Sequence, residues 1–229
     1  MKFDIKDYKK LISTNDEAKR MARNGAPEGT VIVAGMQTGG RGRHGKSFYS
    51  PEGGLYMSLI LRPKFDGMTL ITPAAAVAVC RAVNKYGFDC KIKWVNDIYK
   101  GDKKVCGILT ESDVSEGRAV LGIGINTVSP GKDAPDIADG LFEYGKADNK
   151  RLLHDVLSYF EEIYEKLPDT DFIGYYRERS YLSGKRFTVN GVEYGYAGIA
   201  DDFGLLAEAD GKTVKFKSGE VSIIINNEK

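Results

Sequence analysis

The distribution of hydrophobic and polar residues along the chain predicts three helices. The first ends at about Arg23, and Thr14 with Glu17 three residues later fits a capping box at its start. Thr72 followed by Pro73 is typical of an N-cap with proline at the first helical position, and this second helix is expected to end near residue 86. The third is expected at residues 149–167, where hydrophobic residues recur at helical spacing.

Short runs of β-branched and alternating hydrophobic residues predict strands between these helices. The runs fall at residues 30–34, 55–61, 90–94, 105–111 and 119–126, and we expect the last two to pair with each other. Residues 130–148 are rich in Gly, Pro and Asp and are expected to form a loop. This mixture of elements predicts an α+β domain.

The pattern changes at about Ser183, where short strands begin to follow one another. Asn190-Gly191 and Asp210-Gly211 are turn sequences of hairpins, and residues 201–204 predict a further tight reversal. A segment of this kind predicts a small β-barrel appended to the α+β domain. We therefore divide the chain into two expected domains, residues 1–182 and residues 183–229.

The composition excludes several classes of protein. The 229 residues are 42% hydrophobic and 28% charged, as in a globular protein, and they suffice for one large core and a small second domain. The formal net charge of +1 provides no global positive field that would hold nucleic acid. Any site for an anion must therefore be a local arrangement of charged side chains.

Cysteine usage and the lack of long apolar segments favour a cytoplasmic protein. Cys80, Cys90 and Cys106 are odd in number and show no C-x-x-C spacing, which argues against a zinc site or a disulfide framework. The N-terminal segment lacks the apolar core of a signal peptide, and the most apolar stretch, residues 71–80, is too short to span a bilayer. We expect no association with a membrane.

A glycine-rich, basic segment at residues 37–46 is the first candidate for chemistry. Its glycines satisfy G-x-G-x-x-G, but a dinucleotide fold requires a helix to open at the third glycine, and here Pro51 and a strand follow instead. Glycines let a backbone approach a ligand, and arginine side chains form planar forks for phosphate and carboxylate oxygens. The segment therefore suggests an anion clamp, with a solvated basic hairpin as the alternative. Its charged residues are Arg41, Arg43, His44 and Lys46.

Two further segments carry polar residues at strand ends. Lys93–Asp97 presents Lys, Asn and Asp together, either as a polar cluster or as a capped turn, and Trp94 within it is more often a core residue than a stacking platform. Gly122–Asn126 is an apolar strand with two glycines and a terminal asparagine. Glycine weakens a strand, so these two indicate either close approach by a ligand or a bulge.

Taken in order, these segments resemble the biotin protein ligase family across essentially the whole chain. The resemblance implies a catalytic domain with a mixed β-sheet flanked by helices, as in class II aminoacyl-tRNA synthetases, and a C-terminal SH3-like barrel. Each motif is weak alone, but six in this order are specific. They are STN at 13–15, GRGRHG at 40–45, KWVND at 93–97, CGILTE at 106–111, GIGIN at 122–126, and a tail with GIADDFGLL at 198–206 and GEVS at 219–222.

The resemblance also implies the reaction. Biotin and ATP, with Mg²⁺, give biotinyl-5′-adenylate and pyrophosphate, and the biotinyl group then passes to a specific lysine of the biotin carboxyl carrier protein of acetyl-CoA carboxylase or a related carboxylase. Family members include monomers and homodimers. Only 12 residues precede Ser13, too few for the DNA-binding domain of the family's repressor members, so we expect no DNA binding.

Roles from the family pass to matching positions of this chain. The expected catalytic residues are Arg43, Lys104 and Asp97. The expected biotin-binding residues are Ser13, Thr14, Asn15, Gln37, Gly40, Arg41, Gly42, Arg43, Lys104, Gly107, Gly122 and Gly124. The expected ATP-binding residues are Arg41, Arg43, Phe48, Lys93, Asn96, Lys104 and Asn126. The chain carries no direct metal-binding motif, and Mg²⁺ is expected to arrive with ATP.

The chain departs from the family pattern at three of the quoted positions. Val95 stands where proline is usual, Phe48 where tryptophan is common and Lys46 where arginine is common. Two alternative functions share part of this pattern. One is a lipoate or octanoate protein ligase of the same fold, and the other is a non-catalytic biotin-binding module. For Asp97, a role in orienting or deprotonating the acceptor lysine stands beside a role as a turn cap.

Overall fold

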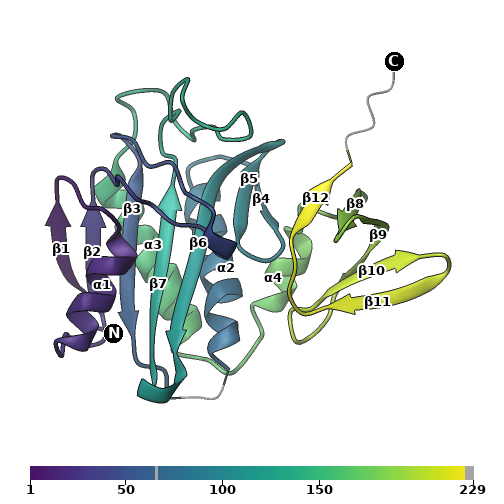
Figure 1. Ribbon diagram of the computed structural model, residues 1–229, viewed down its shortest axis with the longest axis horizontal. Coiled ribbons are helices and arrows are strands. Elements are labelled where there is room, and N and C mark those ends of the chain that lie inside the picture. Colours follow the sequence, from purple (N-terminus) through teal and green to yellow (C-terminus); the bar gives the residue numbers. More distant parts are fainter. Residues whose placement is uncertain (65–66, 225–229) are drawn as a thin grey trace.

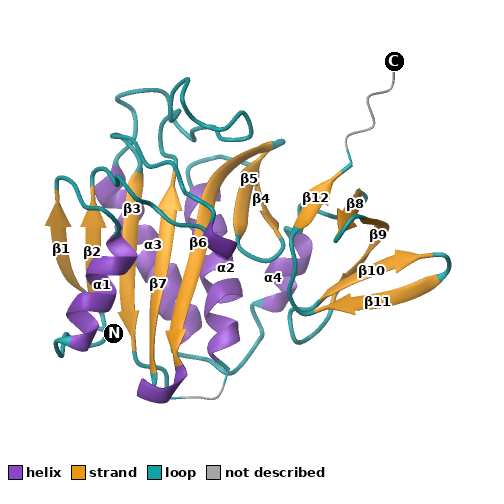
Figure 2. Ribbon diagram, viewed as in Figure 1, coloured by secondary structure: helices purple, strands orange, loops and turns teal. Residues whose placement is uncertain are grey.

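The computed structural model describes residues 1–64 and 67–224, which form two sheets and the helices that pack on them (Figures 1 and 2). The larger sheet has seven strands. Only β1 and β2 pair in parallel, and the other neighbours are antiparallel, so the sheet is mixed. In spatial order the strands are β1 (Asp4–Tyr8), β2 (Thr30–Ala34), β3 (Leu55–Leu61), β7 (Arg118–Ile125), β6 (Lys103–Asp113), β5 (Asp97–Lys100) and β4 (Cys90–Lys93).

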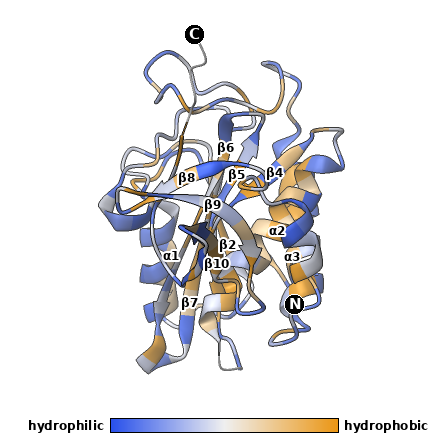
Figure 3. Cartoon of the chain, turned by 90° about the vertical axis from the view of Figure 1, so that its right-hand side faces the viewer, coloured by the Kyte–Doolittle hydropathy of each residue, from blue (hydrophilic) through white to orange (hydrophobic). Residues whose placement is uncertain are grey.

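Helices cover both faces of this sheet, because its central strands are hydrophobic on both sides. On β3, for example, Leu59 and Ile60 point to opposite faces and are both fully buried. Helix α1 (Thr14–Arg23) packs on one face, and α2 (Ile71–Asn84) and α3 (Asn149–Tyr164) pack on the other, where α2 contacts α3 (Figure 1). Figure 3 shows the hydrophobic residues concentrated on α2 and α3.

The second sheet has five antiparallel strands and follows a short helix, α4 (Ile173–Glu178). Asn190 and Asp210 have positive φ and each precedes a glycine, which confirms the two predicted hairpin turns. In spatial order the strands are β11 (Lys212–Phe216), β10 (Leu205–Ala209), β9 (Val192–Ile199), β8 (Arg186–Val189) and β12 (Val221–Ile223).

The expected barrel is not closed. Within residues 186–223, β11 and β12 are the two outer strands of the sheet and do not pair with each other. Most of β11 is exposed, so closing the sheet around it would bury little apolar surface. The hairpin of β10 and β11 instead extends away from the rest of the molecule (Figure 1).

Aromatic residues join the two sheets into one hydrophobic core. The indole Nε1 of Trp94 donates a hydrogen bond of 2.8 Å to the carbonyl of Phe203, which lies in the turn before β10. The Phe203 ring stacks on Phe172 at 5.0 Å and meets Tyr176 edge-on at 5.5 Å. Trp94 is thus a core residue. The division at residue 183 falls between α4 and β8 and stays a prediction.

Several local predictions were shifted or incomplete. Ser13, not Thr14, caps α1, since its Oγ accepts a hydrogen bond from the Asp16 backbone N–H at 3.4 Å. Helix α2 begins at Ile71, so Pro73 is its third residue rather than its first. Strands β1 and β5 and helix α4 were not predicted. No helix in the described part of the chain is long and apolar enough to cross a membrane.

Candidate active site

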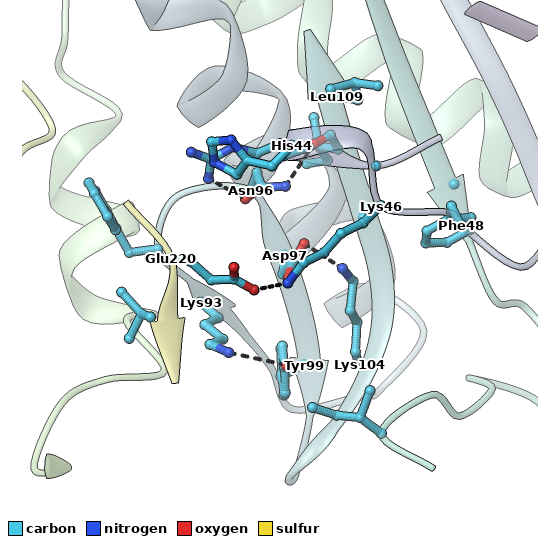
Figure 4. Close-up of a pocket in the computed structure, with 18 of the residues that line it drawn as sticks. His44, Lys46, Phe48, Lys93, Asn96, Asp97, Tyr99, Lys104, Leu109 and Glu220 are labelled. Atoms are coloured by element: carbon cyan, nitrogen blue, oxygen red, sulfur yellow. Dashed lines mark hydrogen bonds and ion pairs between the residues drawn. The ribbon is translucent and has the colours of Figure 1, made fainter. Parts of the chain in front are cut away.

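A cavity of about 850 Å³ lies on the α1 side of the central sheet and extends to the C-terminal sheet (Figure 4). Residues of α1, the glycine-rich loop, β4 to β7 and the segment around β12 line it. It brings together most of the predicted site residues, which are separated by up to about half the chain. Those in its lining are Ser13, Thr14, Asn15, Gln37, Arg41, Gly42, Arg43, Phe48, Lys93, Asn96, Asp97, Lys104, Gly107, Gly122 and Gly124.

At the end next to α1, neutral side chains form a hydrogen-bonded network. The Gln37 Oε1 accepts from the backbone N–H and the hydroxyl of Thr14, at 2.8 and 3.0 Å, and its Nε2 donates to Ser50 at 2.9 Å. The Ser58 hydroxyl lies 2.8 Å from Thr14 Oγ1 and 2.6 Å from Asn15 Oδ1. Each amide is therefore fixed in one orientation, which prepares this end for a neutral ligand with both donors and acceptors.

Glu111 completes this network and was not among the predicted site residues. Its carboxylate accepts from Asn15 Nδ2 and from Lys19 Nζ, both at 2.8 Å. Burial acts to raise the pKa of Glu111, but the Lys19 ammonium and the Asn15 amide outweigh it and hold the pKa below its ordinary value. Asn15 is thus bound on both sides by protein groups, and Glu111 positions it.

The glycines of β6 and β7 leave room for side chains that lie flat on the sheet. A Cβ on Gly122 would be 2.1 Å from Asn15 Oδ1, and one on Gly124 would be 2.6 Å from the Phe48 ring. A Cβ on Gly107 would also meet that ring, at 3.0 Å. Strand β7 keeps an unbroken register with both neighbours here, so the glycines mark close approach and not a bulge.

We expect Gly122→Ala to lower the free energy of unfolding by about 1–3 kcal/mol, because the new methyl group must displace a hydrogen-bonded amide. Denaturant unfolding measures this. Gly174→Ala is the control, since a Cβ there meets nothing within 4 Å and the site is helical. Equal or higher stability of Gly122→Ala relative to wild type would contradict the tight packing of Asn15 on β7.

Charged residues surround the middle of the cavity. Lys104 Nζ lies 2.8 Å from Asp97 Oδ1, and both side chains are partly buried. Arg43 donates to Asn96 Oδ1 at 3.0 Å, while Asn96 Nδ2 donates to the Ile108 carbonyl at 2.9 Å. Asp97 begins β5 and its carboxylate faces Lys104 (Figure 4). The structure thus gives Asp97 a charged partner on the neighbouring strand β6.

The glycine-rich loop covers the cavity without forming a dinucleotide-binding turn. Arg43–Gly45 make one 3₁₀ turn with His44 at positive φ, and the chain continues extended at Lys46, so no helix follows the third glycine. Arg41 forms an ion pair with Asp16 of α1, and Lys46 forms one with Glu220 of the C-terminal segment. The loop is therefore held on two sides of the cavity, unlike a freely solvated hairpin.

Two predicted site residues lie outside the cavity lining. Gly40 packs behind the loop, where a Cβ would be 2.4 Å from the Phe48 carbonyl oxygen. Asn126 is buried, and its backbone forms hydrogen bonds with the backbones of Val105 and Leu141.

The sequence analysis also missed two residues of the site, Ser58 and Glu220, which lie on distant segments of the chain. Within the described ranges, no three His, Cys, Asp or Glu residues gather as a preformed metal site.

Comparisons with known proteins agree with this geometry. Residues 9–127 match the biotin/lipoate A/B protein ligase family. The bifunctional ligase/repressor BirA of Bacillus subtilis is 38% identical, over 93% of this chain and 72% of the relative. The biotin–[acetyl-CoA-carboxylase] ligase of Mycobacterium tuberculosis is 30% identical, over 91% of this chain and 85% of the relative.

Solved structures share the fold over nearly the whole chain. The biotin protein ligase of Aquifex aeolicus in complex with biotin and ATP has a TM-score of 0.83 and 28% identity, covering 96% of this chain and 98% of that one. The α+β fold with a small C-terminal β-domain is thus that of biotin protein ligases. On sequence and structure together, the chain belongs to the biotin/lipoate A/B protein ligase family.

Proposed function

We propose that this protein is an ATP-dependent biotin protein ligase. It would activate biotin as biotinyl-5′-adenylate and pass the biotinyl group to a lysine of the biotin carboxyl carrier protein of acetyl-CoA carboxylase or a related carboxylase. The observation that carries the proposal is one cavity in which a neutral, hydrogen-bonding end adjoins a cationic end. The similarity of the chain to biotin ligases indicates which substrates this cavity binds.

The neutral end suits the ring system of biotin, whose ureido group offers one carbonyl acceptor and two N–H donors. The buried hydroxyl groups of Ser13 and Thr14 and the half-buried amide of Gln37 provide donors and acceptors at this end, and hydrogen bonds between Thr14 and Gln37 hold both in fixed orientations. The glycines of β7 have no side chain that would project into the adjoining part of the cavity. We therefore place the ring here and direct the carboxylate toward Lys104.

The cationic end suits ATP. Among the described residues the cavity lining has an excess of four positive charges, because seven lysines and arginines face three carboxylates. The whole chain has a formal charge of only +1, so the field is concentrated in this cavity. The cations are Arg41, Arg43, Lys46, Lys93, Lys104, Lys185 and Arg186, and the acids are Asp97, Asp102 and Glu220.

In the first step the biotin carboxylate attacks the α-phosphorus of ATP, a new C(O)–O–P linkage forms, and pyrophosphate leaves. Two anions must approach, and negative charge develops on the α-phosphate in the transition state. Lys104 and Arg43 are the lining cations that would stabilise it. Mg²⁺ would bind chiefly through the phosphates of ATP, with Asp97, Asp102 and Glu220 as the lining carboxylates that could ligate it. Mg²⁺ would supply charge neutralisation.

The product of this step is a mixed anhydride that water would hydrolyse. The glycine-rich loop lies over the cavity, and its Arg43 bonds Asn96 on the far side. We propose that this cover excludes water from the adenylate and keeps it from reacting with unselected lysines. The same loop must open for the substrates to enter.

In the second step the ε-amino group of the carrier lysine attacks the acyl carbon and AMP leaves. The amine must be neutral, although the reference pKa of lysine is about 10.4. Asp97 is a partly buried carboxylate in the cavity, and we propose that it orients or deprotonates this amine. Lys104, 2.8 Å from Asp97 Oδ1, would hold this carboxylate in position.

Biotin-dependent exchange of labelled pyrophosphate into ATP tests the first step. We expect exchange with biotin and Mg²⁺ and none with lipoate or octanoate. Exchange that requires lipoate or octanoate instead would identify a ligase for those acids. Biotin binding with no exchange would indicate a non-catalytic biotin-binding module. Either outcome would overturn the proposal. The cytoplasmic location and a homodimer stay predictions.

A further inference from the structure

Two charged residues, Lys19 and Glu111, lie behind the neutral end of the cavity and outside its lining. Lys19 comes from α1 and Glu111 from β6, and their side chains meet at 2.8 Å with both partly buried. An ion pair that is removed from water gains little stability, because the cost of desolvation offsets the attraction between the charges. A pair at this position therefore suggests a role in the site rather than in stability.

The two carboxylate oxygens of Glu111 have different partners. Oε1 accepts from Lys19 Nζ and Oε2 accepts from Asn15 Nδ2, each at 2.8 Å. An ionised carboxylate can only accept hydrogen bonds. The buried amide of Asn15 must therefore turn its nitrogen toward Glu111 and its oxygen toward Ser58, whose Oγ lies 2.6 Å away.

The orientation of Asn15 decides which groups donate in the next hydrogen bonds. Ser58 has one proton for two oxygen neighbours, and the amide oxygen of Asn15 can only accept, so Ser58 donates to Asn15 and faces Thr14 Oγ1, at 2.8 Å, as an acceptor. The Thr14 hydroxyl can give its own proton to Ser58 or to Gln37 Oε1, at 3.0 Å. In either case Thr14 Oγ1 keeps a lone pair for a donor in the cavity, which it lines.

Glu111 maintains this order of donors only while it is ionised, because a protonated carboxyl group could donate to Asn15 Oδ1 and let the amide turn over. Burial acts to raise the pKa of Glu111, but hydrogen bonds from Lys19 and Asn15 and the charge of Arg41 hold it below its ordinary value. The other charged group at this position is Asp16 of α1, 3.3 Å from Lys19 Nζ. Lys19 is thus the cation in direct contact with Glu111.

We propose that Lys19 and Glu111 are positioning residues for biotin, which act through Asn15 and Ser58 to fix the hydroxyl oxygen of Thr14 as the acceptor of a ureido N–H. This inference rests on the proposed function and adds a determinant of biotin affinity outside the cavity. Glutamine in place of Glu111 keeps the shape of the side chain but adds a donor for Asn15 Oδ1. The order of donors can then reverse, and the Ser58 proton occupies the lone pair that biotin needs.

Steady-state pyrophosphate exchange tests the role of Glu111. We expect Glu111→Gln to raise KM for biotin about tenfold, the effect of losing one hydrogen bond, while kcat and KM for ATP stay within about twofold of the wild type. Glu116→Gln is the matched control, since Glu116 is an exposed acid in the turn after β6. It should match the wild type. An unchanged KM for biotin in Glu111→Gln, or a fall in kcat in its place, would overturn the inference.

The pH dependence of biotin binding, measured by calorimetry without ATP, tests the role of Lys19. Lys19→Met removes the ammonium, so the effect of burial on Glu111 is less opposed and its pKa rises. Since the order of donors requires an ionised Glu111, the dissociation constant for biotin should rise more steeply in this variant than in the wild type as the pH falls from about 7 to about 5. Lys19→Arg keeps the charge and should restore the wild-type profile.

Arg20→Met is the control for the loss of a cation from α1, because Arg20 is exposed and pairs with Glu17. Its pH profile should equal that of the wild type, and the titrations of His44 and of the biotin carboxylate are common to all the proteins compared. Equal profiles for Lys19→Met and the wild type would overturn the role of Lys19, while exchange by the wild type would leave the proposed function standing. A wild-type chain that bound no biotin would overturn both.

Discussion

Replacing Lys104 by alanine is expected to lower the rate of biotin-dependent pyrophosphate exchange by about 10²–10³, or about 3–4 kcal/mol in the barrier. The ammonium group lies in the middle of the cavity, 2.8 Å from Asp97, between the neutral end and the cationic end. In the reaction that we propose, it would stabilise the charge that develops when the biotin carboxylate attacks the α-phosphate. Initial rates at saturating ATP and biotin measure the effect.

Lys103→Ala is the matched control for this experiment. Lys103 is the preceding residue of β6, but its side chain is exposed and bonds the Asp136 carbonyl outside the cavity. We expect its exchange rate to equal that of the wild type. If Lys104→Ala also exchanged pyrophosphate at the wild-type rate, Lys104 would have no part in adenylation. Another cation of the cavity would then have to stabilise the transition state.

Replacing Asp97 by asparagine is expected to slow transfer from preformed adenylate to the carrier by about 10²-fold, a typical contribution of a general base. Asparagine keeps the shape of the side chain but cannot accept the proton of the attacking amine. Single-turnover transfer from isolated enzyme–adenylate complex measures this step alone. It thereby separates transfer from any effect on adenylation through Lys104.

Asp113→Asn controls for the loss of one carboxylate from the same sheet. Asp113 ends β6, pairs with Arg118 at 3.0 Å and lies outside the cavity lining. Its transfer rate should equal that of the wild type. Normal transfer by Asp97→Asn would refute the base role of Asp97.

The sequence was most informative where local chemistry dictates local structure. Asn190-Gly191 and Asp210-Gly211 can adopt the positive φ of a hairpin turn, and both turns are present. The hydrophobic spacing of residues 149–167 gave α3, which the structure ends at Tyr164. Strand β1 was missed because its residues, DIKDY, are largely charged and form an outer strand with little buried surface.

The C-terminal barrel illustrates a different limit. Turns and alternation identify strands, but closure depends on whether the outer strands have apolar surface to bury against each other. Strand β11 has four exposed positions out of five, and the described sheet stays open. The family resemblance supplied the expected barrel, and the side chains of β11 explain the difference.

For the site, the glycines were the most useful signal. Gly122 and Gly124 weaken a strand, and the structure shows the close approach of Asn15 and Phe48 that requires them. Glu111 and Glu220 could not be selected in the same way, because their positions depend on pairing between distant segments. Glu220 reaches the cavity only through the packing of the C-terminal sheet.

The central claim is that this cavity joins biotin to a carrier lysine at the expense of ATP. The most direct test is the mass spectrum of a recombinant biotin carboxyl carrier domain after incubation with this protein, ATP, Mg²⁺ and biotin. We predict a gain of one biotinyl group at a single lysine, dependent on ATP. An unmodified carrier, beside an enzyme shown to be folded and to bind biotin and ATP, would contradict it.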